Sequence, residues 1–272
     1  MQSRPWRSEG RIPAQPAPSL RRRLQDRLIT EQKLTILAFD TAQGALSAAI
    51  LGEEGDVLAH RFEARTRGHA EALMPLVEEV LADAGLGLEA IAALAVTVGP
   101  GTFTGLRVGL AAARGIALAR ALPLVGVTTL EAVAAPVEAR PGETVAAAFD
   151  ARRDEIYLQA FDAAHAPLSD PMLVALEDAA AHVPGTAVVI AGTGAELLAA
   201  ELKARGLAAR IAPAAPQPDA LWVARIARAR LAAHGPDRFR APPAPLYLRA
   251  PDAKLPGGRD PAPDPAEGDA RS

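Results

Sequence analysis

The order of predicted strands and helices repeats once along the chain, and this repeat constrains the fold more than any single motif does. Each half opens with an apolar strand that ends in Phe-Asp, at Asp40 and at Asp150. Each then continues through two more strands, a helix, a strand and a Gly-x-Gly turn that leads into another helix. The two turns lie at Gly99/Gly101 and at Gly192/Gly194. A β-β-β-α-β-α order given twice predicts two α/β lobes with a cleft between them.

Composition leaves few ways to build a metal site or a nucleophile. The 272-residue chain has no cysteine, which excludes disulfides, thiolate metal ligands and a cysteine nucleophile, and which fits a reducing, cytoplasmic environment. Its five histidines are scattered, and none has the HExxH spacing of a paired metal site. A Gly-x-Ser-x-Gly nucleophile elbow is also missing. We therefore expect no metal and no cofactor, and a peptidase is disfavoured.

Charge is distributed unevenly between the ends of the chain and its body. Residues 1–33 carry eight basic and three acidic side chains and several prolines, which predicts a disordered basic extension. Residues 250–272 are rich in proline and acidic groups and are predicted to form a disordered acidic tail. The remaining acidic body is a poor stand-alone binder of nucleic acid, so a contact with RNA would need a partner. No apolar stretch approaches the roughly 20 residues of a membrane span.

The segment GPGTFTGLRVG, residues 99–109, joins an apolar strand to an Ala-rich helix. Glycines allow close approach of the backbone, and Thr102 or Thr104 can cap the helix, whose first N–H groups are able to cradle an anion. The segment is not a P-loop, because no Gly-Lys-Ser/Thr follows, and its glycine spacing does not match the dinucleotide fingerprint. A tight turn without a ligand is the alternative, which spacing alone slightly favours.

The repeat resembles the arrangement of the actin-like ATPase (ASKHA) superfamily, which includes sugar kinases and heat-shock ATPases. In active members, the hairpin after the first strand of each lobe holds phosphate or its metal through an Asp followed closely by Gly, Thr or Ser. The resemblance places a vestigial nucleotide or anion site at Asp40, Thr41, Gly99, Gly101, Asp150 and Arg152. The second corner, DARRD, lacks the glycine, so we expect the second lobe to be degenerate. That both aspartates only end strands and cap turns remains the alternative.

Six segments resemble, in order, the TsaB (YeaZ) family over about residues 34–249. They are FDTAQGALSAAIL, GHAEALMPLVEEVL, GPGTFTGLRVGLAAARGIA, PLVGVTTLEAVA, FDARRDEIY and PLYLR. The resemblance implies a first, partner-binding lobe at residues 34–135 and a second lobe at residues 142–249. In PLYLR, Tyr247 and Arg249 are expected to dock the chain end onto the body, with the tyrosine ring buried.

The same resemblance implies a non-catalytic subunit. Such a subunit binds and activates TsaD, which transfers a threonylcarbamoyl group to the adenosine next to the anticodon of tRNAs. The ATPase TsaE resets the assembly, and tRNA is contacted only through the complex. TsaD relatives carry a His-x-x-x-His pair where this chain has His69 and Leu73. The alternatives are an active actin-fold ATPase or kinase, and a peptidase-like homodimeric binding module, which could coexist with the accessory role.

The family's contact between two pairs of helices, together with the spacing of small and apolar residues, predicts a partner surface. Gly105, Gly109 and Ala113 recur every four positions and so share one helix face. The predicted interface comprises His69, Leu73, Leu76, Phe103, Thr104, Gly105, Arg107, Gly109 and Ala113. The alternative is that both helices use these residues only to pack on their own sheet.

Overall fold

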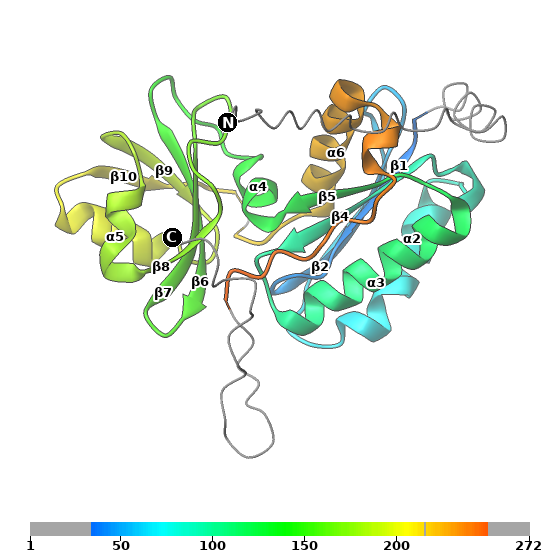
Figure 1. The fold of residues 1–272 in the computed structure, drawn as a ribbon, viewed down its shortest axis with the longest axis horizontal. Helices are drawn as coiled ribbons and strands as arrows, with labels where there is room; N and C mark the ends of the chain where they lie inside the picture. Colours follow the sequence, from blue (N-terminus) through cyan, green and yellow to red (C-terminus); the bar gives the residue numbers. More distant parts are fainter. Residues whose placement is uncertain (1–33, 215, 250–272) are drawn as a thin grey trace, which may run out of the picture.

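The computed structural model describes residues 34–214 and 216–249 and contains two five-stranded sheets, one in each lobe (Figure 1). The predictions made for residues 1–33 and 250–272 lie outside the described residues. The first sheet has the order β3-β2-β1-β4-β5 and the second the order β10-β9-β6-β7-β8. Read from the opposite edge, the second order matches the first, because β6 occupies the place of β1. The structure thus confirms the duplicated, two-lobed α/β fold.

In the first lobe, two helices cover one face of the sheet. The strands are β1 (Ile36–Asp40), β2 (Ala45–Leu51), β3 (Val57–Ala64), β4 (Ala93–Gly99) and β5 (Leu124–Thr128). The covering helices are α2 (His69–Asp83) and α3 (Phe103–Arg120), with the short 3-10 helix η1 (Leu88–Ala90) between them. β1 is antiparallel to β2 and parallel to β4. Successive side chains of each strand point to opposite faces of the sheet, and both faces are apolar and buried.

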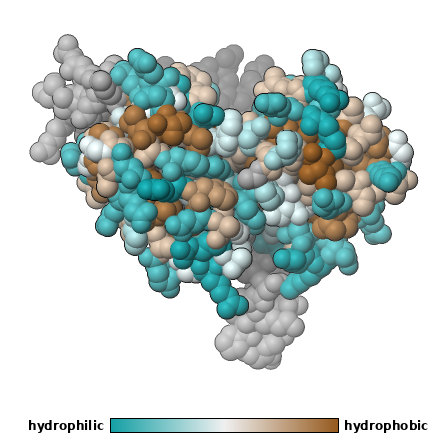
Figure 2. All heavy atoms as spheres, turned by 180° about the vertical axis from the view of Figure 1, so that it is seen from behind, coloured by the Kyte–Doolittle hydropathy of each residue, from teal (hydrophilic) through white to brown (hydrophobic). Residues whose placement is uncertain are grey.

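The second lobe repeats this plan with smaller helices. Its strands are β6 (Thr144–Arg152), β7 (Glu155–Phe161), β8 (Met172–Ala175), β9 (Ala187–Ala191) and β10 (Ala208–Ile211). One face is covered by α5 (Ala195–Ala204) and the 3-10 helix η2 (Leu176–His182). On the rear of the molecule, hydrophobic residues gather in patches on both lobes (Figure 2).

The inner faces of the two sheets are covered by α4 (Thr129–Ala134) and α6 (Ala220–His234), and the latter is followed by the 3-10 helix η3 (Pro236–Phe239). α4 follows the first sheet in sequence, yet Leu130 and Val133 pack with Phe149 of the second sheet. α6 follows the second sheet but buries Val223 and Ala227 against the first. α6 was expected in the second lobe, at residues 142–249, but it packs on the sheet of the first lobe. The apolar stripe of α6 reveals a buried face but not which sheet it covers.

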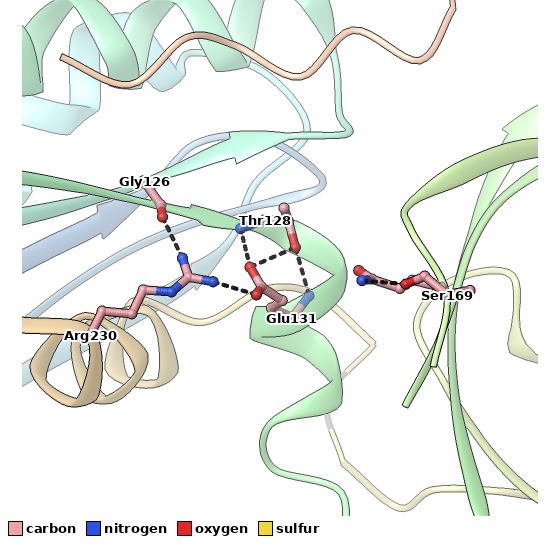
Figure 3. A network of polar contacts seen from close by, with 6 residues as sticks. Gly126, Thr128, Glu131, Ser169 and Arg230 are labelled. Atoms are coloured by element: carbon pink, nitrogen blue, oxygen red, sulfur yellow. Dashed lines mark hydrogen bonds and ion pairs between the residues drawn. The ribbon is translucent and has the colours of Figure 1, made fainter. Parts of the chain in front are cut away.

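A network of polar contacts joins α4 to α6 (Figure 3). Arg230 Nη1 donates to the carbonyl of Gly126 at 2.6 Å, and the same guanidinium forms an ion pair with Glu131. The Glu131 carboxylate also accepts from the backbone N–H and the hydroxyl of Thr128, each at 2.9 Å. The Thr128 hydroxyl in turn accepts from the backbone N–H of Glu131 at 3.1 Å, which completes a capping box at the start of α4. Because Arg230 is on α6, the helices that cover the two sheets are fixed to each other.

None of the helices in the described ranges combines the length and the hydrophobicity of a membrane-spanning segment.

Candidate functional site

The corner of the first lobe buries its carboxylate completely. Asp40, the last residue of β1, accepts a hydrogen bond on Oδ1 from the Thr97 hydroxyl at 2.5 Å and another from the backbone N–H of Ala42 at 3.2 Å. Its Oδ2 has no hydrogen-bond partner among the described residues. Burial raises the pKa of Asp40 to about 7, and the nearby Asp219 also raises it, while the Thr97 and Ala42 hydrogen bonds lower it. Asp40 is thus a core carboxyl that is partly protonated near neutral pH.

The glycine-rich turn packs directly on this corner. The backbone N–H of Thr102 donates to the carbonyl of Ala42 at 2.8 Å, and the Thr41 hydroxyl donates to the carbonyl of Gly105 at 2.6 Å. A Cβ atom at Gly105 would lie 2.1 Å from the Thr41 carbonyl oxygen, and one at Gly101 would lie 2.4 Å from that of Ala42. The glycines therefore serve contact between two backbone segments of the same lobe. This geometry supports the interpretation as a tight turn, with Thr102 as the N-cap of α3.

The corner of the second lobe is an exposed and strained hairpin. The Asp150 carboxylate accepts from the backbone N–H of Arg152 at 2.8 Å and also forms an ion pair with the Arg152 guanidinium at 3.0 Å. Residues 152–154 have φ angles of 64°, 58° and 56°, a left-handed conformation that L-residues adopt at an energetic cost. This hairpin lacks the glycine that would let backbone N–H groups close on a phosphate. It presents instead the Asp150 carboxylate, which is already paired with Arg152.

The two corners meet at a cleft of about 510 Å³ between the lobes. Its lining includes Gln43, Gly101, Asp150, Arg152 and Arg249. Of the residues predicted for a vestigial nucleotide or anion site, the structure brings together Gly101, Asp150 and Arg152.

The other three predicted residues do not line this cleft. Asp40 and Thr41 are buried beneath the glycine-rich turn. Gly99 faces the chain itself, because a Cβ atom there would lie 2.7 Å from the carbonyl oxygen of Leu246. A phosphate in this cleft would therefore meet an ion pair between Asp150 and Arg152 rather than a free carboxylate.

Sequence reasoning missed a larger cavity of about 810 Å³ beside this cleft. Its walls come from the segment after α4, the end of β10 and the start of α6, and include Pro136, Arg140, Arg210 and Trp222. Gln217 lines both cavities, and its side chain accepts from the backbone N–H of Gly44 at 2.9 Å. No sequence signal marks this cavity, because its lining comes from two segments, residues 132–141 and 210–222, that are remote from each other along the chain.

The small-residue face of α3 points inward, which corrects the predicted interface. Gly105, Gly109 and Ala113 are buried, and a Cβ atom at Gly109 would lie 2.6 Å from the Thr41 hydroxyl. Leu73 and Leu76 of α2 belong to the same core. Small residues every four positions allow close approach of a helix to any neighbour, and here the neighbour is the lobe's own sheet. These five residues are therefore not available to a partner.

The remaining predicted interface residues lie on the surface. Phe103 is 42% exposed, Thr104 and Arg107 are exposed, and His69 is half-buried with Nε2 lying 3.2 Å from the carbonyl oxygen of Ala45. Sequence reasoning missed two other exposed apolar side chains of these helices, Met74 on α2 and Leu118 near the end of α3. The sequence alone does not show that these two side chains are exposed, because that depends on which face of each helix is buried.

No group of three His, Asp or Glu side chains suited to hold a metal ion occurs in the part of the chain that the structure describes.

Comparisons with known proteins agree with this architecture. The family model described as TsaD, tRNA N6-adenosine threonylcarbamoyltransferase, matches residues 56–185. The chain is 46% identical over 101 residues to the tRNA threonylcarbamoyladenosine biosynthesis protein TsaB of Escherichia coli, covering 37% of this chain and 43% of that relative. It is 36% identical over 221 residues to an uncharacterized protein of Mycobacterium tuberculosis, covering 81% of this chain and 94% of that protein. The match thus spans less than half the length of the TsaB relative.

A solved structure extends the likeness over most of the described chain. YeaZ from Pseudomonas aeruginosa superposes with a TM-score of 0.65 at 28% identity, covering 79% of this chain and all of that one. A second structure, of an uncharacterized Pseudomonas aeruginosa protein with similarity to the peptidase YeaZ, gives a TM-score of 0.67 at 29% identity over the same share. Sequence and structure agree in placing the chain in the TsaB/YeaZ family.

Proposed function

We propose that this chain is a non-catalytic subunit that binds and activates TsaD in the transfer of the threonylcarbamoyl group to the adenosine next to the anticodon of tRNAs. Two comparisons support it. The Escherichia coli relative is named for threonylcarbamoyladenosine biosynthesis, and the matching family model is named for the transferase TsaD. TsaE is proposed as a further member of this cytoplasmic complex, with tRNA contacted through the complex rather than by this acidic chain alone.

The non-catalytic role is supported above all by the two corners, where neither aspartate is free to act on a phosphate. A phosphate-transferring member of this fold needs an accessible carboxylate and free backbone donors at the cleft. Asp40 is sealed in the core, and Asp150 is paired with Arg152. The chain would therefore contribute to modification by binding, and not by turnover of its own.

The exposed face of α2 and α3 is the surface proposed for TsaD. The two helices lie side by side on the outside of the first lobe (Figure 1), and Phe103, Arg107 and Leu118 share one face of α3. Leu118 is 85% exposed and Met74 on α2 is 39% exposed, an unusual placement for large apolar side chains. When TsaD is absent, the same surface is proposed to pair two copies of this chain.

Reconstitution tests the proposed activity. Purified TsaD, TsaE, threonylcarbamoyl-adenylate and tRNA are combined with and without this chain, and threonylcarbamoyladenosine is quantified by mass spectrometry of nucleosides. We expect modification only when the chain is present, and no ATP hydrolysis by the chain alone. Robust modification without the chain would contradict an activating role, and ATP turnover by the purified chain would contradict a non-catalytic one.

The surface is tested by Leu118→Asp, with Leu168→Asp as the matched control, because Leu168 is half-exposed in the second lobe. A charge placed within an apolar interface should weaken TsaD binding at least about tenfold, or about 1.4 kcal/mol. Both variants should melt like the native protein. Equal TsaD affinity for the two variants would exclude this face from the interface.

A further inference from the structure

Residues 240–249, here called the strap, run from the end of η3 across the first lobe to the second (Figure 1). Arg240 Nη1 donates to the carbonyl of Ala121 at 2.9 Å, and Arg114 donates to the carbonyl of Pro243 at 2.6 Å. Further along, the backbone N–H of Leu246 donates to the carbonyl of Val98 at 2.7 Å. The strap is thus fixed along its length by hydrogen bonds to the first lobe.

Two glycines of the first lobe make room for the strap. A Cβ atom at Gly126 would lie 2.8 Å from Cβ of Pro243, and one at Gly99 would lie 2.7 Å from the carbonyl oxygen of Leu246. Contacts this close leave little freedom for the segment to shift without moving the strands beneath it.

Beyond Leu246, the strap joins an exposed cluster at the start of α3. The ring of Tyr247 lies 5.4 Å from that of Phe103, and the Arg107 guanidinium lies 3.6 Å above the Phe103 ring. Arg107 Nε also donates to the Tyr247 hydroxyl at 3.4 Å. Tyr247 therefore docks the chain end as predicted, but the residue is 42% exposed rather than buried. Phe103, Arg107 and Tyr247 form one surface feature from two remote segments, the aromatic cluster.

Two residues later, the strap reaches the second lobe. Arg249 Nη1 donates to the carbonyl of Ala151 at 2.7 Å, and the same guanidinium forms an ion pair with Glu155. Ala151 and Glu155 flank the three left-handed residues 152–154. A single guanidinium therefore holds both sides of the strained hairpin, residues 150–155, at the mouth of the inter-lobe cleft.

We propose that the strap couples the aromatic cluster to the strained hairpin, so that a contact that holds Tyr247 in place also stabilises residues 150–155. Tyr247 and Arg249 are only two residues apart on a segment fixed at Val98, so a displacement of one moves the other. Coupling of this kind is reciprocal, because stabilising either end favours the same arrangement of the strap. That TsaD is the partner that covers the cluster rests on the function proposed above. The coupling within the chain does not.

Hydrogen exchange of the full chain, read in the peptide that covers residues 150–155, tests the coupling directly. Tyr247→Ala and Arg249→Ala are each expected to raise the exchange rate of the hairpin about tenfold, because local opening becomes easier. Arg238→Ala, just before the strap, is the exposed-residue control and is expected to leave the rate unchanged. Melting followed by circular dichroism confirms that each variant is folded.

The decisive variant is Tyr247→Ala, because the contacts described for Tyr247 are all made to the first lobe. Native exchange at the hairpin in this variant would overturn the coupling, even if Arg249→Ala loosens the hairpin by removing its direct contacts. Addition of TsaD should slow hairpin exchange in the native chain and not in Tyr247→Ala. TsaD that binds without slowing the hairpin, while Tyr247→Ala loosens it, would contradict a TsaD contact at the aromatic cluster and leave the coupling standing. Failure of TsaD to bind at all would contradict the proposed function, while the variants without TsaD still decide the coupling.

Discussion

The first strands of the two lobes occupy equivalent places in their sheets, yet they end in opposite environments. Asp40 ends β1 under a glycine-rich turn that excludes it from the cleft, and its carboxyl is fully buried. Asp150, near the end of β6, lies on a hairpin whose three left-handed residues are held from outside by Arg249. The duplicated topology thus survives where the chemistry of the corners does not. Strand order alone says little about what either lobe can bind.

The lobes also differ in how much of the chain supports them. The first sheet is covered on both faces, by α2 and α3 outside and by α6 inside, and it receives the strap as well. The second sheet is covered outside by one short helix and a 3-10 segment, and inside by the six-residue α4. The first lobe is therefore covered by longer helices than the second. The ion pairs of Arg230 with Glu131 and of Arg249 with Glu155 tie the second lobe to it.

The largest effect should come from adding one methyl group at the sealed corner. Gly105→Ala places a Cβ atom 2.1 Å from the Thr41 carbonyl oxygen, so the backbone must shift, at a cost of about 3 kcal/mol or more in the free energy of unfolding. Gly115→Ala on the same helix has nothing within 4 Å and should stabilise the protein by about 0.5–1 kcal/mol. Urea denaturation measures both. Equal stabilities of the two variants would show that the turn is not packed as described.

The buried carboxyl of Asp40 should make the stability of the protein depend on pH. The pKa of Asp40 is about 7 in the folded state and 3.8 for the ordinary side chain, so folding takes up a proton between these values. The contribution of Asp40 to stability is therefore fully present below pH 3.8 and is lost as the pH rises through 7. Between pH 5 and pH 8 the native free energy of unfolding should fall by on the order of 2 kcal/mol, whereas Asp40→Asn should remove this dependence.

Glu143 changes the free energy of unfolding in the opposite direction, but only below the range from pH 5 to pH 8. Hydrogen bonds from Arg210 and from the backbone of Arg140 lower the pKa of Glu143 to about 2. Its contribution is present above pH 4.5 and is lost as the pH falls toward 2, outside that range. A pH dependence that persists unchanged between pH 5 and pH 8 in Asp40→Asn would assign it to other groups.

The smallest effect is expected at the exposed hairpin. Arg152 has a φ of 64°, which glycine adopts without cost, so Arg152→Gly should be about 1 kcal/mol more stable than Arg152→Ala. Both variants lose the ion pair with Asp150, which is worth little because the Arg152 side chain is 84% exposed. The difference in thermal stability between the Arg152→Gly and Arg152→Ala variants therefore measures the cost of the backbone conformation alone. A less stable glycine variant would mean that residues 152–154 are not strained.

The sequence predicted the elements better than it predicted their neighbours. The repeat, the turn at residues 99–109 and the Thr102 cap follow from local patterns of apolar residues, glycines and hydroxyls, and the structure contains all three. The same patterns could not say that Gly109 faces Thr41 or that α6 packs on the first sheet, because periodicity identifies a buried face without its partner. The aromatic cluster combines residues from α3 and the strap, which only the fold brings together.

We propose that this chain supports tRNA modification by binding TsaD and not through the chemistry of either corner. The direct measurement is threonylcarbamoyladenosine formation by TsaD and TsaE with the double variant Asp40→Asn/Asp150→Ala, compared with the native chain at saturating concentration. Asparagine preserves the shape of a protonated Asp40, and Asp150 is paired on the surface, so we expect the variant to support the native rate with unchanged affinity for TsaD. A folded variant that binds TsaD normally but no longer supports modification would contradict the account and assign a catalytic part to these carboxylates.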